Sequence, residues 1–499
     1  MRPSGQNPSP EGDERRPVRR LRGFFDRVLG FGFELLLVVA AADLADDRGR
    51  EDERDEADQD LAAVAASVFV LGVDGGPAVG PGAALVAAQP ARGELRAAVN
   101  FHLQQGNVDH VSTFDGHGLR REGRSGPEPG EFREGQRFVA AVASERMDDS
   151  ERAFLDDLLA SSTPSGYEAP GQRVWVDYVT DFADEVRTDD YGNAVAVRAG
   201  SGPDIAVAGH ADQIGLLVRE IDDEGHLHVG PVGGMDVTVT CGQQVTVRAD
   251  DGDVPGVIGQ TAIHVREDND DDDEERVADQ LVDVGAVDGE AARDLVAVGD
   301  PITIDGEVTD LQGTRVAGPG MDNRAGMWTA AAALRRSVAA GVDATVYAVS
   351  TVQEEVGLRG ARMVGFDLDP DAVVAVDVTH ALDYPNAPDD RASDVALGDG
   401  PVLSRGSANH PALVDALRAT AADAGVDVQL QSASTTTDTD ADAFYTSRSG
   451  IPSTYLGIPN RYMHTPVEVV DTADLSAAAD LLTAFLADAG DHSPFTVDI

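Results

Sequence analysis

Lysine is absent from this 499-residue sequence, so all 38 basic residues are arginine, and they face 89 Asp and Glu residues. The formal net charge of −51 excludes a protein that binds nucleic acid by neutralising its phosphates. Aromatic residues make up only 5% of the chain, but hydrophobic residues reach 42%, which is enough to form ordinary folded cores. We therefore expect a globular protein with no nucleic-acid partner.

Cysteine occurs once, at Cys241, so neither an intramolecular disulfide nor a cluster of thiolate metal ligands can form. This suits a reducing compartment, and we expect a cytoplasmic protein. Long apolar runs are also absent, because the stretches at 35–42 and 61–73 are too short to span a bilayer. The polar segment 1–22 lacks the apolar centre and cleavage site of a signal peptide, so we expect no membrane association.

The excess of acidic residues carries information about the solvent. Self-repulsion at this net charge destabilises a compact fold unless counter-ions screen it. The screening length falls from about 10 Å at 0.1 M salt to about 3 Å at 1 M salt. The acids are spread through segments with apolar periodicity, which argues against an acidic interaction tail. The composition therefore predicts a protein built for molar intracellular salt, from a salt-loving host.

The charge is unevenly distributed along the chain. Of the totals given above, residues 1–146 hold 18 Arg and 24 acids, net −6, which leaves 20 Arg and 65 acids, net −45, for residues 147–499. The first part shows no sustained helical or strand period. We expect the protein to start at Met147, with 1–146 a misread upstream frame or a disordered extension. The alternative is a genuine regulatory or membrane-peripheral domain with an amphipathic helix at 24–42.

After Met147 the apolar pattern alternates between helices and buried strands, with a β-rich interruption. Helices are expected at 148–159, 174–182, 325–340, 411–424 and 472–487, and strands at 194–198, 205–208, 344–350, 372–378 and 453–456. Short strands at 237–239, 244–247 and 301–304 indicate an inserted β domain. The acidic run at 267–275 lacks the glycine and the final Glu of a calcium loop, and we expect a solvated loop there.

Five short polar segments follow apolar strands or turns: Gly209-His210-Ala211-Asp212, Gly320-Met321-Asp322-Asn323-Arg324, Gln353-Glu354-Glu355-Val356-Gly357, Val376-Asp377-Val378-Thr379-His380 and Tyr462-Met463-His464-Thr465-Pro466. Together they offer two histidines and several carboxylates. Imidazole and carboxylate ligands suit Zn²⁺ or Co²⁺ in a two-metal hydrolytic site.

Each of these residues alone also has an ordinary explanation. His210 could be a structural histidine, His464 a loop residue, and Asp322 a helix N-cap. The pair Glu354-Glu355 could be solvated, but it directly follows a strand. Its two side chains should therefore point to opposite sides, one to a metal and one free as a general base. Asp377 ends a buried apolar run, where a lone carboxylate is costly without a cation.

This set resembles the M42 family of dinuclear metallo-aminopeptidases, the tetrahedral or TET aminopeptidases, older members of which were labelled endoglucanases. The resemblance runs from about Met147 to the end and includes Ser165-Gly166-Tyr167-Glu168, Leu358-Arg359-Gly360-Ala361 and Val467-Glu468. It implies an α/β fold: a three-layer α/β/α zinc-peptidase catalytic domain of residues 147–218 and 313–499, interrupted at 219–312 by a small barrel-like β-rich oligomerisation domain. One departure is the segment 435–442, where the family often has a Gly-rich approach to Thr-Asp-Ala, and it bears on the substrate pocket.

The resemblance also implies roles for the residues. The implied ligands of two divalent ions, Zn or Co, are His210 and Asp377 at one ion, Glu355 and His464 at the other, and Asp322 between the two. Glu354 is implied as the general acid and base, and Asp212 as the carboxylate behind His210. The activity implied is removal of N-terminal residues from peptides by a metal-activated water. The implied assembly is a homo-oligomer, a dodecamer built from dimers.

Other classes of protein remain open at this point. A related dimetal deacylase or carboxypeptidase shares the ligand set but usually needs a positioned arginine, and only Arg324, Arg359 and Arg461 lie near the motifs. A glycosidase that uses Glu354 or Glu355 would give no reason for the two histidines. A non-catalytic scaffold with a degenerate site would be expected to lack a ligand, and none is missing. Sensitivity to chelators separates the metal enzymes from the other two classes.

Overall fold

The computed structural model describes residues 35–36, 71–72, 147–265, 276–388, 394–497 and 499. The chain divides into two compact units, Met1–Gly126 and Pro127–Ile499. In the first unit, the described residues form two short strands, β1 (Leu35–Leu36) and β2 (Leu71–Gly72), which pair antiparallel. The helix considered for 24–42 is therefore wrong at Leu35–Leu36. The other predictions for 1–146, and the loop expected at 267–275, lie outside the described residues.

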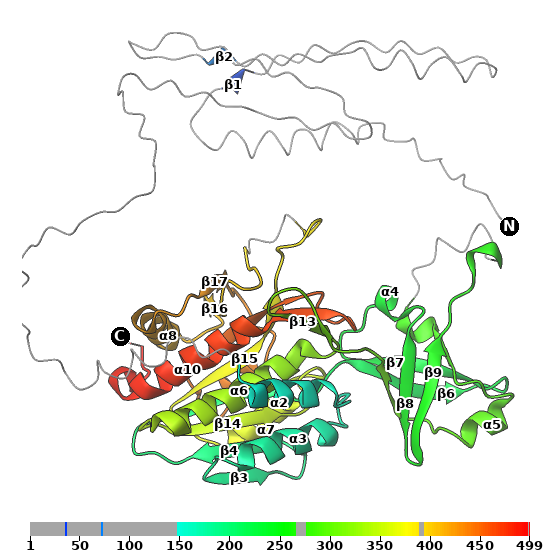
Figure 1. Cartoon of the computed structure of the whole chain (residues 1–499), viewed down its shortest axis with the longest axis horizontal. Coiled ribbons are helices and arrows are strands. Elements are labelled where there is room, and N and C mark those ends of the chain that lie inside the picture. The colour runs from blue at the N-terminus through cyan, green and yellow to red at the C-terminus, as the bar shows by residue number, and fades with distance from the viewer. Residues whose placement is uncertain (1–34, 37–70, 73–146, 266–275, 389–393, 498) are drawn as a thin grey trace, which may run out of the picture. The chain divides into compact units, whose positions relative to one another are not determined.

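The second unit is built on one mixed sheet, in which eleven of the described strands take part (Figure 1). Its strands are β3 (Glu185–Thr188), β4 (Ala194–Arg198), β5 (Asp204–His210), β12 (Thr309–Asp310), β13 (Arg315–Gly318), β14 (Thr345–Thr351), β15 (Ala372–His380), β16 (Val402–Arg405), β17 (Gln429–Ser432), β18 (Ser453–Arg461) and β19 (Glu468–Asp471). At its centre, β14, β5, β15 and β18 are neighbours and run parallel. Their apolar residues are buried on both faces, as expected for parallel strands, and their carboxyl ends meet at one edge.

Helices cover both faces of this sheet (Figure 1). One layer contains α2 (Asp149–Leu159), α3 (Ala169–Thr180), α6 (Met321–Ala340), α8 (Pro411–Ala424) and α10 (Thr472–His492), and the other contains α7 (Arg359–Asp367) and α9 (Ala441–Phe444). Strand β5 shows why two layers form: Ile205 and Val207 pack into the first layer, whereas Ala206 and Ala208 pack into the second. The predicted three-layer α/β/α arrangement is confirmed.

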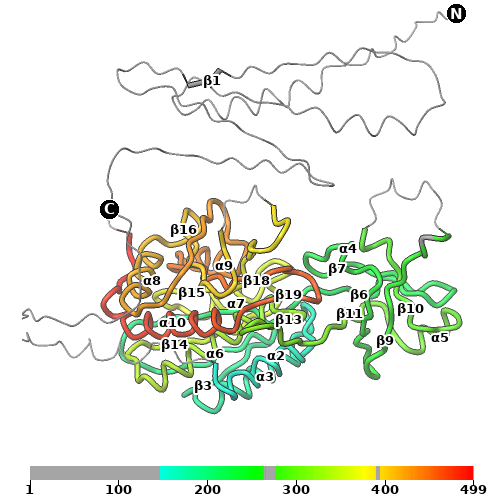
Figure 2. Tube along the Cα trace, turned by 45° about the horizontal axis from the view of Figure 1, so that its top comes forward, coloured from blue at the N-terminus to red at the C-terminus, as the bar shows by residue number. Residues whose placement is uncertain are grey.

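Between the two halves of this domain the chain forms a closed antiparallel barrel with strand order β10-β7-β6-β11-β8-β9. Its elements are β6 (Gly215–Ile221), β7 (His226–Val232), α4 (Val237–Thr240), β8 (Gln244–Ala249), β9 (Gly252–Ile258), η4 (Ile263–Val265), η5 (Val277–Asp279), β10 (Leu281–Asp283), α5 (Gly289–Arg293) and β11 (Pro301–Ile304). Fully buried Leu216, Val218, Val245 and Ile302 fill its core. Figure 2 shows the barrel beside the sheet domain. The predicted domain boundaries at 218 and 312 stay predictions.

Two local predictions need correction. The strand expected at 237–239 is helix α4, because the side chain of Asp236 accepts a hydrogen bond from the backbone N–H of Thr238 and caps a helical turn. Helix α3 begins at Ala169 rather than at 174, with Pro170 in its first turn, where a missing N–H costs nothing. Local capping thus outweighs the β propensity of the Val-Thr-Val run.

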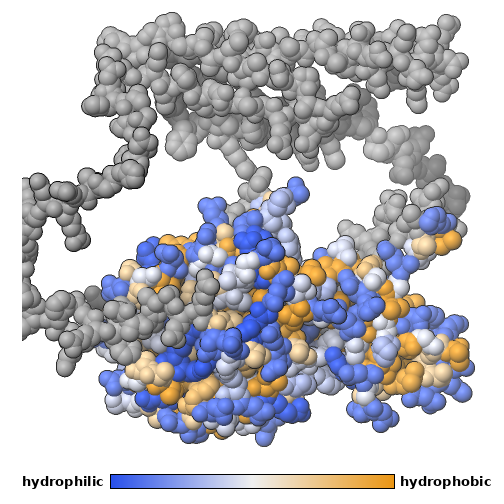
Figure 3. All heavy atoms as spheres, viewed as in Figure 1, coloured by the Kyte–Doolittle hydropathy of each residue, from blue (hydrophilic) through white to orange (hydrophobic). Residues whose placement is uncertain are grey.

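The described surface mixes polar and apolar side chains. Hydrophilic residues cover much of the face seen in Figure 3, with hydrophobic patches between them. Within the part of the chain that the structure describes, no helix has both the length and the hydropathy needed to cross a bilayer.

Candidate metal centre

The predicted site residues come together at the carboxyl edge of the parallel strands. His210 is the last residue of β5, and Asp377 lies near the end of β15. Glu354 and Glu355 follow β14, and His464 follows β18. Because these strands are parallel neighbours, residues far apart in the sequence converge at one point.

Helix α6 brings Asp322 to the same point. A Cβ atom on Gly209 of β5 would lie 2.4 Å from the backbone carbonyl carbon of Gly326, so only glycine lets the strand and the helix pack this closely. The side chain of Asn323 fixes the first turn by donating to the carbonyl of Val376 at 2.8 Å. The backbone of Asp322 and Asn323 is not helical, and Asn323 Oδ1 accepts the backbone N–H of Gly326 at 2.8 Å, so Asn323 caps the regular part of the helix and the N-cap alternative for Asp322 is wrong.

The first candidate group is built around His210. Its Nε2 atom lies 3.1 Å from Asp322 Oδ1, 3.6 Å from Asp377 Oδ1 and 3.8 Å from Glu354 Oε2. All four side chains are buried. One atom each of His210, Glu354 and Asp377 lie close enough together to hold one metal ion.

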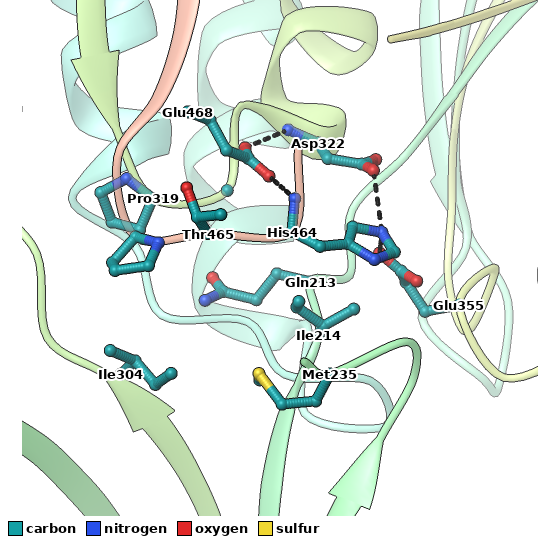
Figure 4. A pocket seen from close by; sticks show the side chains of 12 residues that line it. Gln213, Ile214, Met235, Ile304, Pro319, Asp322, Glu355, His464, Thr465 and Glu468 are labelled. Carbon is teal, nitrogen blue, oxygen red and sulfur yellow. Dashed lines mark hydrogen bonds and ion pairs between the residues drawn. The ribbon is translucent and has the colours of Figure 1, made fainter. Parts of the chain in front are cut away.

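The second candidate group is built around His464 (Figure 4). Its Nε2 atom lies 3.3 Å from Asp322 Oδ2 and 3.6 Å from Glu355 Oε1, and these three residues again lie close enough together to hold an ion. The Nδ1 atom of the same ring is 2.9 Å from the carbonyl of Gly234, in the loop after β7 of the barrel. Asp322 thus directs one carboxylate oxygen to each histidine, which is the position of a bridging ligand.

Behind the first group, Asp212 supports the turn that carries the glutamates. Its Oδ1 accepts the backbone N–H of Glu354 at 2.9 Å, and its Oδ2 accepts that of Glu355 at 3.1 Å. Ser165 Oγ donates to Oδ2 at 2.6 Å. The second nitrogen of the His210 ring also contacts Asp212. Its Nδ1 atom lies 3.2 Å from the backbone carbonyl oxygen of Asp212 and 3.4 Å from Asp212 Oδ1, which fixes the orientation of the ring.

Behind the second group, Glu468 supports two ligand-bearing segments at once. One oxygen accepts the backbone N–H of Asp322 at 2.9 Å and the other that of His464 at 2.7 Å (Figure 4). Glu168 similarly accepts the backbone N–H of Gln353 at 3.1 Å, beside the glutamate pair. In the sequence, Glu468 and Glu168 are recognised only as parts of motifs, and their supporting roles are not predicted. A signal for Glu468 would have been its spacing, four residues after His464.

The electrostatics of the centre show a surplus of negative charge. Burial raises the pKa of Glu354 to about 10 and that of Glu355 to about 8, and it also raises the pKa of Asp377. Burial alone would lower the pKa of His464, but the hydrogen bond to Asp322 and the charge of Glu355 outweigh it and raise that pKa to about 9. In the same way the surrounding carboxylates raise the pKa of His210 despite its burial.

This donor set fits divalent cations. The carboxylates outnumber the imidazoles, and a buried carboxylate is costly unless a cation or hydrogen bonds compensate it. Glu355 Oε1 is buried and has no hydrogen-bond partner, although it faces the second histidine. Nitrogen and oxygen ligands without thiolates suit Zn²⁺ or Co²⁺. The residues present therefore fit a site for two such ions.

Two cavities open onto the centre. The larger, of about 590 Å³, reaches both groups and continues along the ends of β15, β16 and β17 and the segment 432–439. That volume lies within the usual range of ligand pockets. The smaller lies on the barrel side, where Ile214, Met235 and Ile304 face the second group (Figure 4). Of these two, only the larger cavity reaches all of the predicted ligands together with Glu354.

Comparison with known proteins agrees with this geometry. The family model of M42 glutamyl aminopeptidases matches residues 192–481, more than half of the chain. Lysyl aminopeptidase of Pyrococcus furiosus is 35% identical over 337 residues, which cover 67% of this chain and 96% of that protein. The solved TET aminopeptidase of a marine-sediment Thaumarchaeota archaeon is 31% identical, with a TM-score of 0.64, and the match covers 68% of this chain and 97% of the other. The TET1 peptidase of Pyrococcus horikoshii, which can assemble into a tetrahedron or a large octahedral shell, is 29% identical with a TM-score of 0.60, over 67% of this chain and 98% of the other. The chain belongs to the M42 family of aminopeptidases.

Proposed function

We propose that this protein is an aminopeptidase that removes N-terminal residues from peptides with the help of two divalent metal ions. The observation that carries the proposal is the position of Asp322, whose two carboxylate oxygens face the Nε2 atoms of His210 and His464 at 3.1 and 3.3 Å. A carboxylate shared in this way is the expected bridge of a two-metal hydrolytic site. Family membership supports the same chemistry.

The proposed ligands divide between the two groups. We assign His210 and Asp377 to one ion, Glu355 and His464 to the other, and Asp322 to both. When bound, such ions lower the pKa of a water molecule and polarise the carbonyl that is to be cleaved. Asp212 holds the imidazole of His210 in place and fixes the backbone of the glutamate turn.

Glu354 is the proposed general base and acid. It lies next to His210, is buried, and follows the strand end directly, so its Oε2 atom faces the centre rather than bulk solvent. Burial raises its pKa and bound cations would lower it, so the two effects together would set the proton affinity of this carboxylate between those of its reactants. It would accept the proton of the attacking water and return it to the leaving amine.

The proposal also covers how the subunits assemble and where the protein acts. We propose a homo-oligomer, a dodecamer built from dimers, in which the barrel makes subunit contacts, and the shell formed by the Pyrococcus horikoshii relative supports this. A cytoplasmic location at molar salt is supported by the single cysteine and the net charge of −51.

The family model is named for glutamyl residues and the Pyrococcus furiosus relative for lysyl residues, so the names leave the preferred first residue open.

The test is release of p-nitroaniline from leucyl-p-nitroanilide by the full chain in molar KCl. Activity should disappear with EDTA and return when Zn²⁺ or Co²⁺ is restored. A folded protein that binds metal but cleaves no aminoacyl anilide would overturn the proposal in favour of a deacylase or carboxypeptidase. Activity that survives complete removal of metal would overturn the metal-dependent mechanism. Size-exclusion chromatography at high salt tests the assembly, and a monomer alone would contradict the shell.

A further inference from the structure

The larger cavity has a wall that the chemistry of the centre does not use. This wall is formed by the end of β15, by β16 and β17, and by the segment that follows β17. Its lining side chains are mostly hydroxyl-bearing: Thr379, Ser404, Ser432, Ser434, Thr435, Thr436, Thr437 and Thr439. The wall and both candidate metal groups line the same cavity. Under the proposed activity, the first side chain of a peptide bound at the centre can therefore reach the wall.

One carboxylate stands on this wall apart from the metal-binding residues. Asp438 is exposed and lines the cavity. Its backbone is fixed, because its N–H donates to Asp442 Oδ2 at 3.2 Å while the N–H and the hydroxyl of Thr437 donate to the same carboxylate. The φ angle of Asp438 is 56°, in the left-handed region that Asp tolerates better than most residues. The loop thus holds a negative charge at a defined place on the wall.

Positive charge is scarce at the same wall. No arginine is found among the described residues that line the cavity, and the exposed His380 is the one base there outside the metal-binding groups. An acidic side chain would be desolvated beside Asp438 without a guanidinium to pair with it, which disfavours its binding. Apolar surface is limited too, since Val378, Ala433, Tyr455 and Met463 are scattered among the hydroxyls.

We infer that this pocket selects peptides whose first residue is basic, with Asp438 as the residue that pairs with its cationic end. The inference rests on the proposed aminopeptidase activity and names its substrate class. A lysine or arginine side chain carries its N–H groups at the end of a long aliphatic stem, and the hydroxyls and the carboxylate of the wall are acceptors for such groups. Glutamyl and aspartyl peptides are the substrates that the pocket rejects.

The experiment compares kcat/KM of the full chain for the p-nitroanilides of lysine, arginine, leucine and glutamate at one KCl concentration. We expect the lysyl and arginyl substrates to be cleaved at least about tenfold faster than the glutamyl one, because like-charge contacts act against a wrong partner. Glutamyl or leucyl activity above both basic substrates would overturn the inference while leaving the aminopeptidase proposal intact. Failure to cleave any of them would instead remove the proposal on which the inference rests.

Asp438 itself is tested by substitution. Asp438→Asn should lower kcat/KM for lysyl and arginyl substrates about three- to tenfold, mainly through KM, and lower the leucyl value much less, as expected for one exposed ion pair. Asp438→Arg should reverse the order of lysyl and glutamyl substrates. Asp423→Asn, on the exposed side of α8, removes the same charge away from the cavity and from the barrel and serves as the matched control. Equal losses for the basic and leucyl substrates in Asp438→Asn would refute the role of this carboxylate.

Discussion

The carboxylate of Glu468 accepts the backbone N–H of Asp322 at 2.9 Å with one oxygen and, with the other, that of His464 at 2.7 Å. These two residues belong to segments that are distant in sequence, and both are members of the second candidate group. The side chain of Glu468 is buried. It therefore holds Asp322 and His464 in one fixed relationship.

Replacement of Glu468 by glutamine should weaken metal binding more than it weakens the fold. The new side chain would keep one acceptor oxygen but present its amide N–H₂ to one of the two backbone donors. We expect affinity for Co²⁺ to fall about 10- to 100-fold, as is typical when a support of a metal ligand is lost. Titration of the stripped protein with Co²⁺, followed by visible absorption, measures this. The exposed Glu307→Gln is the control, and unchanged affinity in Glu468→Gln would contradict the assigned role.

Replacement of Glu354 by glutamine should separate catalysis from metal binding. We expect two metal ions per chain and an unchanged fold, but a loss of about 10²- to 10⁴-fold in kcat, the usual contribution of a general acid or base. Elemental analysis and anilide kinetics on the same sample check both parts. Turnover near the wild-type level would refute the general-base role. Loss of one ion would instead make Glu354 a ligand of the group that contains His210.

The sequence predicts the parallel core and the site well, because both follow short-range rules. The strand at 194–198 and the helix at 411–424 have the predicted bounds, and an apolar strand that ends in His210 indicates a site at the carboxyl edge. The parallel order of the strands accounts for six of the seven predicted site residues at one centre, whereas Asp322 arrives there on helix α6. Their roles as ligands and base stay predictions.

The remainder depends on contacts that sequence patterns do not encode. Glu468 opens strand β19 beside Val467 and Val469, where alternation predicts a solvated residue, yet it is buried beneath the centre. The approach of Gly234 to the ring of His464 depends on how the barrel docks against the sheet domain. The helical turn α4 depends on one Asp236 side chain that overrides a β-branched run. Each of these is a long-range or single-contact effect.

Stability should respond to pH through Asp474, which lies in α10 and accepts the backbone N–H groups of Gly398 and Gly400. Burial raises its pKa to about 7 from the ordinary value of 3.8. The folded chain therefore holds this proton between about pH 4 and 7 while the unfolded chain releases it. The free energy of unfolding should thus fall as pH rises through this window, by on the order of 1 kcal/mol per pH unit.

Asp474→Asn should remove that contribution. Denaturant unfolding at a series of pH values should give a less negative slope between pH 4 and 7 in the variant than in the wild type. Other buried carboxylates titrate in both proteins, so only the difference between the two slopes is assigned to Asp474. Asp423→Asn, on the exposed side of α8, is the control for the loss of one charge. Parallel slopes in wild type and Asp474→Asn would show that Asp474 has no raised pKa.

Salt should be required for the folded state. Residues 147–499 carry a net charge of −45, and their repulsion acts over about 10 Å at 0.1 M salt but only about 3 Å at 1 M. We expect the far-ultraviolet circular dichroism of the folded protein to be lost on dialysis from 2 M to 0.1 M KCl and to return with salt. Sucrose of equal osmolality is the decisive control, because it favours burial without screening charge. If sucrose restores the fold as well as KCl does, charge repulsion is not what unfolds the protein.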